Sequence, residues 1–112
     1  MTSILVAEDE SRISSFIKKG LQKNGFQTEI AKDGVEALQM MQSNNFDLLL
    51  LDLGLPIIDG WTVLQELRNQ GNQTPIIVVS AYDKPDTKDE IIEYIAKPFR
   101  FQDLLARIQS NL

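Results

Sequence analysis

The sequence predicts an α/β fold in which a parallel sheet of five strands has helices on both faces. Short, almost continuous apolar runs recur along the chain, and amphipathic stretches separate them. Such runs are typical of strands buried on both faces, and their alternation with helices is typical of a doubly wound sheet. The length of 112 residues is that of one ordinary domain. We expect the flavodoxin-like strand order 2-1-3-4-5, with function at the carboxyl ends of the strands.

Five apolar runs are predicted to be strands. The first is short and wholly apolar, and the third is strongly apolar and stops on Asp52. The second is the weakest, and no candidate site residue follows it, as expected for a strand at the edge of the sheet. The predicted strands cover residues 4–7, 26–31, 46–51, 75–79 and 91–96.

Apolar residues at spacings of three and four predict four helices. Ser11 and Asp33 are expected to cap the first two, because their side-chain oxygens can accept hydrogen bonds from free backbone N–H groups. The other two are expected at residues 61–70 and 101–112. The apolar face of the first helix is predicted to be Ile13, Phe16, Ile17 and Leu21. The inward positions of the last are predicted to be Leu104, Leu105, Ile108 and Leu112.

The composition excludes several classes of function. The chain has no cysteine and no histidine, which removes disulfides, thiolate chemistry, most zinc sites and histidine acid–base catalysis. A net charge of -5 argues against nucleic acid as a direct partner. No apolar run is long enough to span a membrane, and the first residues do not resemble a signal peptide, so we expect a cytoplasmic protein without a membrane partner.

Polar side chains follow four of the predicted strands. Glu8 and Asp9 come after the first, Asp52 after the third, Ser80 after the fourth and Lys97 after the fifth. Because the carboxyl ends of parallel strands meet at one edge of a sheet, we expect these residues to converge. Two carboxylates about 5 Å apart repel by about 3 kcal/mol at an effective dielectric of about 20, and a magnesium ion would relieve that repulsion.

The same groups suggest phosphoryl chemistry. Asp52 lies centrally among them, so it is both a candidate magnesium ligand and a candidate nucleophile, since carboxylates attack phosphorus in aspartyl-phosphate chemistry. The Ser80 hydroxyl, the Lys97 ammonium and backbone N–H groups after Asp52 and Ser80 can neutralise phosphoryl oxygens. Taken singly, each residue has a plainer explanation, such as a helix-start charge, a turn residue or a surface lysine. Their position at successive strand ends favours the site.

Four segments carry a resemblance to a known family. "ILVAEDE", "LLLLDLGLPIIDG", "IIVVSAY" and "EYIAKPFRFQDLLARI" resemble the receiver domain of two-component response regulators, and the match covers nearly the whole chain. The resemblance implies one receiver domain at residues 1–112, with no output domain in this chain.

The resemblance also implies roles for individual residues. Asp52 would be the phosphoacceptor. The magnesium ligands would be Glu8, Asp9, Asp52 and the carbonyl of Gly54. The phosphoryl group would be bound by Ser80, Lys97 and Ala81, and the switch residues would be Ser80 and Tyr94. Pro98 matches a proline that usually follows a cis peptide bond.

These roles describe a phosphorylation-dependent switch of a phosphorelay, and not an enzyme beyond its own phosphorylation and dephosphorylation. The donor would be a sensor histidine kinase or a phosphotransfer protein, and the output an effector protein or a fused domain absent from this chain. The oligomeric state stays open. One alternative is an interaction module that keeps the fold but does not switch. Another is a phosphohydrolase, which typically has a second aspartate at the position of Gly54.

The segment between the fourth and fifth strands departs from the family. Lys97 follows Ser80 by 17 positions, fewer than receivers usually have. Pro85 and seven charged residues in this segment disfavour an amphipathic helix. We therefore expect the fourth helix of the family to be shortened or missing, which puts the usual output surface in doubt but not the site.

Overall fold

The computed structural model describes residues 1–81 and 93–112. In these parts, strands and helices alternate along the chain until the last strand. The elements are β1 (Ser3–Ala7), α1 (Ser11–Lys23), β2 (Gln27–Ala31), α2 (Gly34–Ser43), β3 (Leu48–Asp52), α3 (Gly60–Asn69), β4 (Ile76–Ser80), β5 (Glu93–Ala96) and α4 (Phe101–Ser110). In the described ranges no helix is long and apolar enough to cross a membrane.

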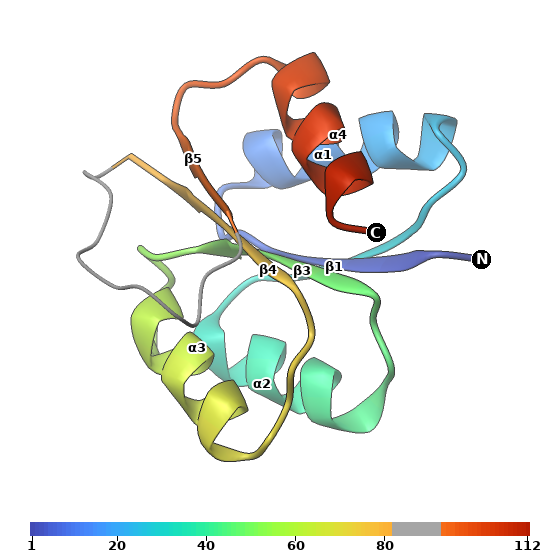
Figure 1. The fold of residues 1–112 in the computed structure, drawn as a ribbon. Coiled ribbons are helices and arrows are strands. Elements are labelled where there is room, and N and C mark those ends of the chain that lie inside the picture. The colour runs from blue at the N-terminus through green and yellow to red at the C-terminus, as the bar shows by residue number, and fades with distance from the viewer. Residues whose placement is uncertain (82–92) are drawn as a thin grey trace.

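The strands form one parallel sheet in the order β2-β1-β3-β4-β5, which confirms the predicted fold. Helices α1 and α4 lie on one face of the sheet, and α2 and α3 lie on the other (Figure 1). The label α4 belongs to the C-terminal helix. The expectation of a shortened or missing helix between β4 and β5 concerns residues 82–92, which lie outside the described residues.

Each face of the sheet has its own apolar core, because successive side chains of a strand point to opposite faces. In β1, Leu5 packs into the cluster under α2 and α3, whereas Ile4 and Val6 pack into the cluster under α1 and α4. Strand β3 is buried along its whole length and supplies residues to both clusters. The central strands are thus held from both faces, so the residues at their ends have firmly supported positions.

The helix starts follow the prediction at one position and depart from it at another. Asp33 caps α2 as predicted, since its Oδ1 accepts the Glu36 N–H at 2.7 Å. The predicted Ser11 cap is wrong: Ser11 is the first residue of α1, and the cap position belongs to Glu10, whose side chain makes no capping bond. The Glu10 N–H instead donates to Glu8 Oε2 at 3.1 Å, so this turn is organised by the neighbouring carboxylate.

Two residues predicted to be inward are exposed. Phe16 is 52% exposed, and its ring meets that of Phe101 edge to face, with 5.9 Å between the ring centroids. The ring of Phe101 lies directly over Gly20 of α1, where an added Cβ would come within 2.4 Å of a ring carbon. The Phe101 ring therefore occupies the surface of α1 beside Phe16. Leu112 is 53% exposed, because α4 ends at Ser110 and Leu112 follows it.

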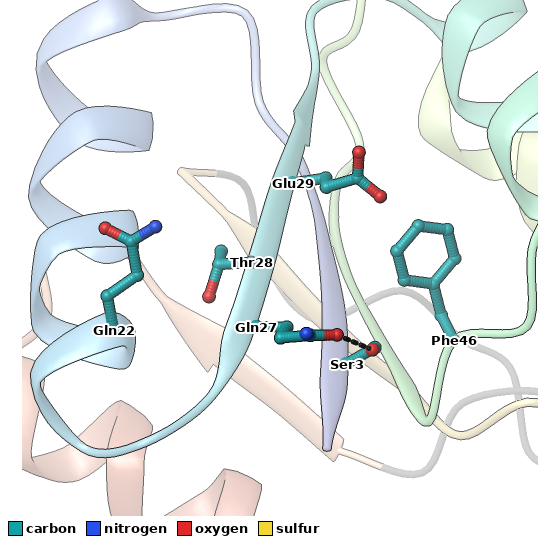
Figure 2. Close-up of a pocket in the computed structure, with 6 residues that line it drawn as sticks. All are labelled: Ser3, Gln22, Gln27, Thr28, Glu29 and Phe46. Carbon is teal, nitrogen blue, oxygen red and sulfur yellow. Dashed lines mark hydrogen bonds between the residues drawn. The ribbon is translucent and has the colours of Figure 1, made fainter. Parts of the chain in front are cut away.

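The amino ends of the strands contain a shallow cavity of about 370 Å³ at the β2 edge. Figure 2 shows Glu29 and Phe46 on one side of β2 and Gln22 and Thr28 on the other, with Ser3 donating to Gln27 Oε1 at 3.1 Å. Amides and hydroxyls dominate this lining, and Glu29 is its only carboxylate. The predicted site lies at the opposite end of the sheet.

Candidate functional site

Three carboxylates meet at the carboxyl ends of β1 and β3. Oxygen atoms of Glu8, Asp9 and Asp52 lie within 4.8 Å of one another. Glu8 and Asp52 are buried, whereas Asp9 is exposed. The fold places them so because Glu8 directly follows β1 and Asp52 is the last residue of β3, and these two strands are neighbours. The structure thus brings together the three side chains predicted to bind the metal.

Lys97 lies between two of these carboxylates. Its Nζ is 2.5 Å from Glu8 Oε1 and 3.3 Å from Asp52 Oδ2, and its side chain is only 16% exposed. The lysine directly follows β5, and its backbone N–H donates to the Ser80 carbonyl at 2.8 Å. The Lys97–Pro98 peptide bond is cis, in agreement with the resemblance. The ammonium therefore acts as a counter-ion inside the acidic pocket.

The pocket holds more negative than positive charge, and the pKa values reflect that. Burial raises the pKa of Glu8 above 4.5, and the charge of Asp52 adds to this, although Lys97 and the Glu10 N–H act in the opposite direction. Burial acts to lower the pKa of Lys97, but its hydrogen bond to Glu8 and the charge of Asp52 outweigh this and raise it above 10.5. The two rises have different causes: burial outweighs the ammonium at Glu8, whereas the carboxylates outweigh burial at Lys97.

The turn after β3 orients the Asp52 side chain. Asp52 Oδ1 accepts the Gly54 N–H at 3.0 Å, and its Oδ2 faces Lys97. Gly60 closes the loop, since its N–H donates to the Leu53 carbonyl at 3.0 Å. A Cβ at Gly60 would lie 2.2 Å from the Asp52 carbonyl oxygen, so this close approach requires glycine. Gly54 itself is exposed.

The same loop contains a strained turn that the sequence did not reveal. Ile57 has φ +71°, and the Ile58 N–H donates to the Pro56 carbonyl at 2.8 Å, which makes a γ-turn around Ile57. The Pro56 carbonyl also accepts the Gly34 N–H at 3.2 Å, which ties the turn to the start of α2. Ile57 is 78% exposed. Glycine is the residue expected at such a φ, so the sequence carried no signal for this turn.

The remaining predicted site residues surround this pocket. Ser80 is the last residue of β4 and is fully buried, and Ala81 follows it at the surface. Ala81, Lys97 and Pro98 line a mainly apolar cavity of about 340 Å³. The cavity is completed by Ile13, Phe16 and Phe99. Tyr94 lies farther back in β5, where it packs against the cluster under α2 and α3.

An arginine contact to β5 was also missed by the sequence interpretation. Arg107 Nη1 donates to Glu93 Oε2 at 3.0 Å and to the Tyr94 carbonyl at 2.9 Å. The sequence contained one signal for this contact. Arg107 lies three residues after Leu104 and one before Ile108, so it is next to the buried face of α4.

The fold and the site together define a class: a doubly wound α/β domain whose buried aspartate, two further acidic residues and a lysine meet at the carboxyl edge of the sheet. The family model described as the response regulator receiver domain matches residues 4–109. The chain belongs to this family.

Curated relatives carry response-regulator names. The chain is 40% identical over 119 residues to the response regulator ArlR of Staphylococcus saprophyticus, an alignment that covers 100% of this chain and 53% of ArlR. It is 32% identical to the transcriptional regulatory protein PcoR of Escherichia coli, over 100% of this chain and 52% of PcoR. The chain therefore spans about half the length of these relatives. The alignment with ArlR is longer than the 112 residues of this chain, so ArlR has residues with no counterpart here.

Solved structures agree over nearly the whole chain. The receiver domain of the Francisella response regulator 1452 has a TM-score of 0.92 at 36% identity and covers 99% of this chain and 96% of its own. The response regulator TrrA of Thermotoga maritima, solved in complex with Mg(2+)-BeF, has a TM-score of 0.90 at 34% identity and covers both chains fully. TrrA was also solved in complex with the histidine kinase ThkA, with a TM-score of 0.88 and coverage of 100% and 99%.

Proposed function

We propose that this chain is a phosphorylation-dependent signalling switch that accepts a phosphoryl group on Asp52 in a magnesium-dependent reaction. The donor is a histidine kinase or a phosphotransfer protein, and the setting is the cytoplasm. One observation carries the proposal: oxygen atoms of Glu8, Asp9 and Asp52 lie within 4.8 Å of one another, with the Lys97 ammonium against two of these carboxylates. The TrrA complexes with Mg(2+)-BeF and with a histidine kinase support the same assignment by homology.

The donor set fits magnesium. The ion prefers carboxylate oxygens, a carbonyl and water, and the three carboxylates offer hard oxygen donors in a space that one ion can bridge. Glu8, Asp9, Asp52 and the Gly54 carbonyl would hold it, with Asp9 as the more direct ligand and Glu8 acting through water. When bound, magnesium supplies positive charge to the phosphoryl oxygens and to the attacking carboxylate.

The protein groups divide the rest of the reaction between them. An oxygen of Asp52 forms the bond to phosphorus as the donor nitrogen leaves, and the Gly54 N–H holds the carboxylate in one orientation. Lys97 already contacts Asp52 Oδ2, so its ammonium is placed to move to a phosphoryl oxygen. The Ser80 hydroxyl and the Ala81 N–H, at the end of the adjacent strand, take the remaining oxygens.

Phosphorylation then shifts an equilibrium between two conformations. Ser80 moves toward the phosphoryl group, and Tyr94 turns inward in response. An effector protein, or an output domain in a longer protein, recognises the shifted form. The activity of the chain is limited to its own phosphorylation and dephosphorylation.

Acetyl phosphate with magnesium chloride, followed by intact-protein mass spectrometry, tests the assignment. The wild type should gain the mass of one phosphoryl group, and Asp52→Ala should gain none. Asp103→Asn removes an exposed carboxylate of α4 that is not part of the acidic cluster, and should be labelled like the wild type. An unlabelled wild type, or equal labelling of Asp52→Ala, would refute the proposal.

A receiver-fold module that does not switch is the second candidate. It is favoured by the alignment, in which ArlR carries residues that this chain lacks. Such a module would bind magnesium and beryllofluoride without a change at Tyr94. Nuclear magnetic resonance of the Tyr94 ring, with and without beryllofluoride, decides between the two candidates.

A further inference from the structure

Strand β5 lies at an edge of the sheet. It is last in the strand order, so in the described part of the chain only β4 pairs with it. The Lys97 N–H points toward β4, where it donates to Ser80. Because backbone groups alternate in direction along a strand, the N–H and carbonyl of Tyr94 point to the outer edge. The backbone of the switch residue therefore lies on the side of β5 that no described strand covers.

Arg107 of α4 occupies that outer edge. One guanidinium nitrogen, Nη1, donates both to the Tyr94 carbonyl at 2.9 Å and to Glu93 Oε2 at 3.0 Å. The Arg107 side chain is 43% exposed and that of Glu93 is 35% exposed. The contact thus joins the last helix to β5 at two successive residues, through the side chain of Glu93 and the backbone carbonyl of Tyr94.

The two partners lie on opposite faces of the sheet. Arg107 comes from α4, which lies on the same face of the sheet as α1 (Figure 1). Glu93 shares that face with Ile95, which lies two residues later in β5 and packs into the cluster under α1 and α4. The Tyr94 ring packs against the cluster under α2 and α3, on the other face. Arg107 therefore acts on Tyr94 through the backbone alone, because the sheet separates the guanidinium from the ring.

We propose that Arg107 is a positioning residue for Tyr94: it holds the β5 backbone in place, so that phosphorylation moves the tyrosine ring and not the strand. The inference rests on the proposed function, since it takes Tyr94 as the switch residue. Without the guanidinium, β5 loses the bond at the Tyr94 carbonyl that ties this strand to α4, and the strand and the ring can move together. The ring then samples its two positions even in the unphosphorylated protein.

Fluorine NMR of the switch tyrosine provides the test. The chain has two tyrosines, so a Tyr82→Phe background labelled with 3-fluorotyrosine reports on Tyr94 alone. Spectra are recorded with magnesium, before and after addition of beryllofluoride. Arg107→Leu removes both contacts. Glu93→Gln is the matched control, because it removes the charge of Glu93 and leaves the bond from Arg107 to the Tyr94 carbonyl.

With Arg107 present, we expect one sharp resonance that moves on addition of beryllofluoride. In Arg107→Leu the starting resonance should be broadened or displaced toward the beryllofluoride position, and the further shift should be at most half that of the parent. Glu93→Gln should behave like the parent. Labelling of Asp52 by acetyl phosphate should stay within twofold in both variants, because neither residue contacts the pocket.

The failures of the two proposals give different results. A parent response with an equal response in Arg107→Leu overturns the role of Arg107 and leaves the switch intact. A parent that is labelled on Asp52 but shows no Tyr94 shift overturns both the switch and this inference, and an unlabelled parent overturns the phosphoacceptor itself. Should Arg107→Leu not fold, Arg107→Met decides, because it keeps an unbranched side chain of similar length but has no donor for either contact. A full parent-like response there overturns the inference.

Discussion

Replacement of Ile57 by glycine and by alanine tests whether the turn in the loop after Asp52 is strained, because strain reverses the usual order of stability of the two variants. At an ordinary exposed position, glycine is less stable than alanine by about 0.5–1 kcal/mol, because the unfolded chain gains freedom. At Ile57 the φ of +71° places any Cβ in the left-handed region, which costs an L-residue about 1–2 kcal/mol and costs glycine little. Both replacements lose the same small burial, since Ile57 is 78% exposed. We therefore expect Ile57→Gly to be more stable than Ile57→Ala by about 0.5–1 kcal/mol.

Urea denaturation followed by the fluorescence of Trp61, the only tryptophan, measures the difference. With a slope of about 1–3 kcal/mol per molar, the two midpoints should differ by several tenths of a molar. Gln65, exposed within α3, is the matched control, and there the alanine variant should be the more stable by about 1 kcal/mol. An Ile57→Ala variant as stable as Ile57→Gly, or more so, would refute the reading of the turn as strained.

Three further predictions concern the pocket and its loop. Lys97→Met leaves the buried carboxylates without their counter-ion, so its free energy of unfolding in EDTA should be about 2–3 kcal/mol lower than that of the wild type. Magnesium should restore part of this loss. Urea titration measures both effects, and an unchanged midpoint in EDTA would contradict the pairing. Gly60→Ala should lower the free energy of unfolding by about 3 kcal/mol or more, because the new Cβ meets the Asp52 carbonyl. Gly25→Ala, at φ +87° with open space around it, should lower it by about 1 kcal/mol, and equal melting temperatures of the two variants would contradict this. Because folding raises the pKa of Glu8, ionisation of this carboxyl lowers the stability of the folded protein. In EDTA, the wild type should therefore gain stability relative to Glu8→Gln as the pH falls toward 4.5. The opposite slope would show that the attraction of Lys97 outweighs the effect of burial on Glu8.

The strand ends were predictable because they depend on pattern alone. A continuous apolar run must be buried, and the polar residue that stops it must lie where the strand leaves the core, which placed Asp52, Ser80 and Lys97 at one edge. The order of the sheet followed from the alternation of strands and helices, together with the fold class it indicates. The boundaries were less accurate: Asp52 belongs to β3 itself, and Ser80 belongs to β4 itself.

Contacts between distant residues could not be predicted in the same way. The Ser11 cap was misplaced by one residue, because α1 already begins at Ser11 and Glu10 takes the cap position. The bond from Arg107 to the Tyr94 carbonyl depends on where α4 packs beside an edge strand, which no local pattern encodes. The γ-turn at Ile57 was hidden because tertiary contacts, and not a glycine, impose its conformation.

The position of Lys97 changes what metal binding means for this domain. In a pocket of carboxylates alone, the repulsion between them would oppose folding until a cation was bound. Here the chain provides a resident cation, so the acidic wall assembles before any ion arrives. Under the proposed function, magnesium would enter by exchange with an ammonium that stays tethered to the chain. The affinity for magnesium would then be the difference between two ionic contacts, and the displaced lysine would stay within reach of the phosphoryl group.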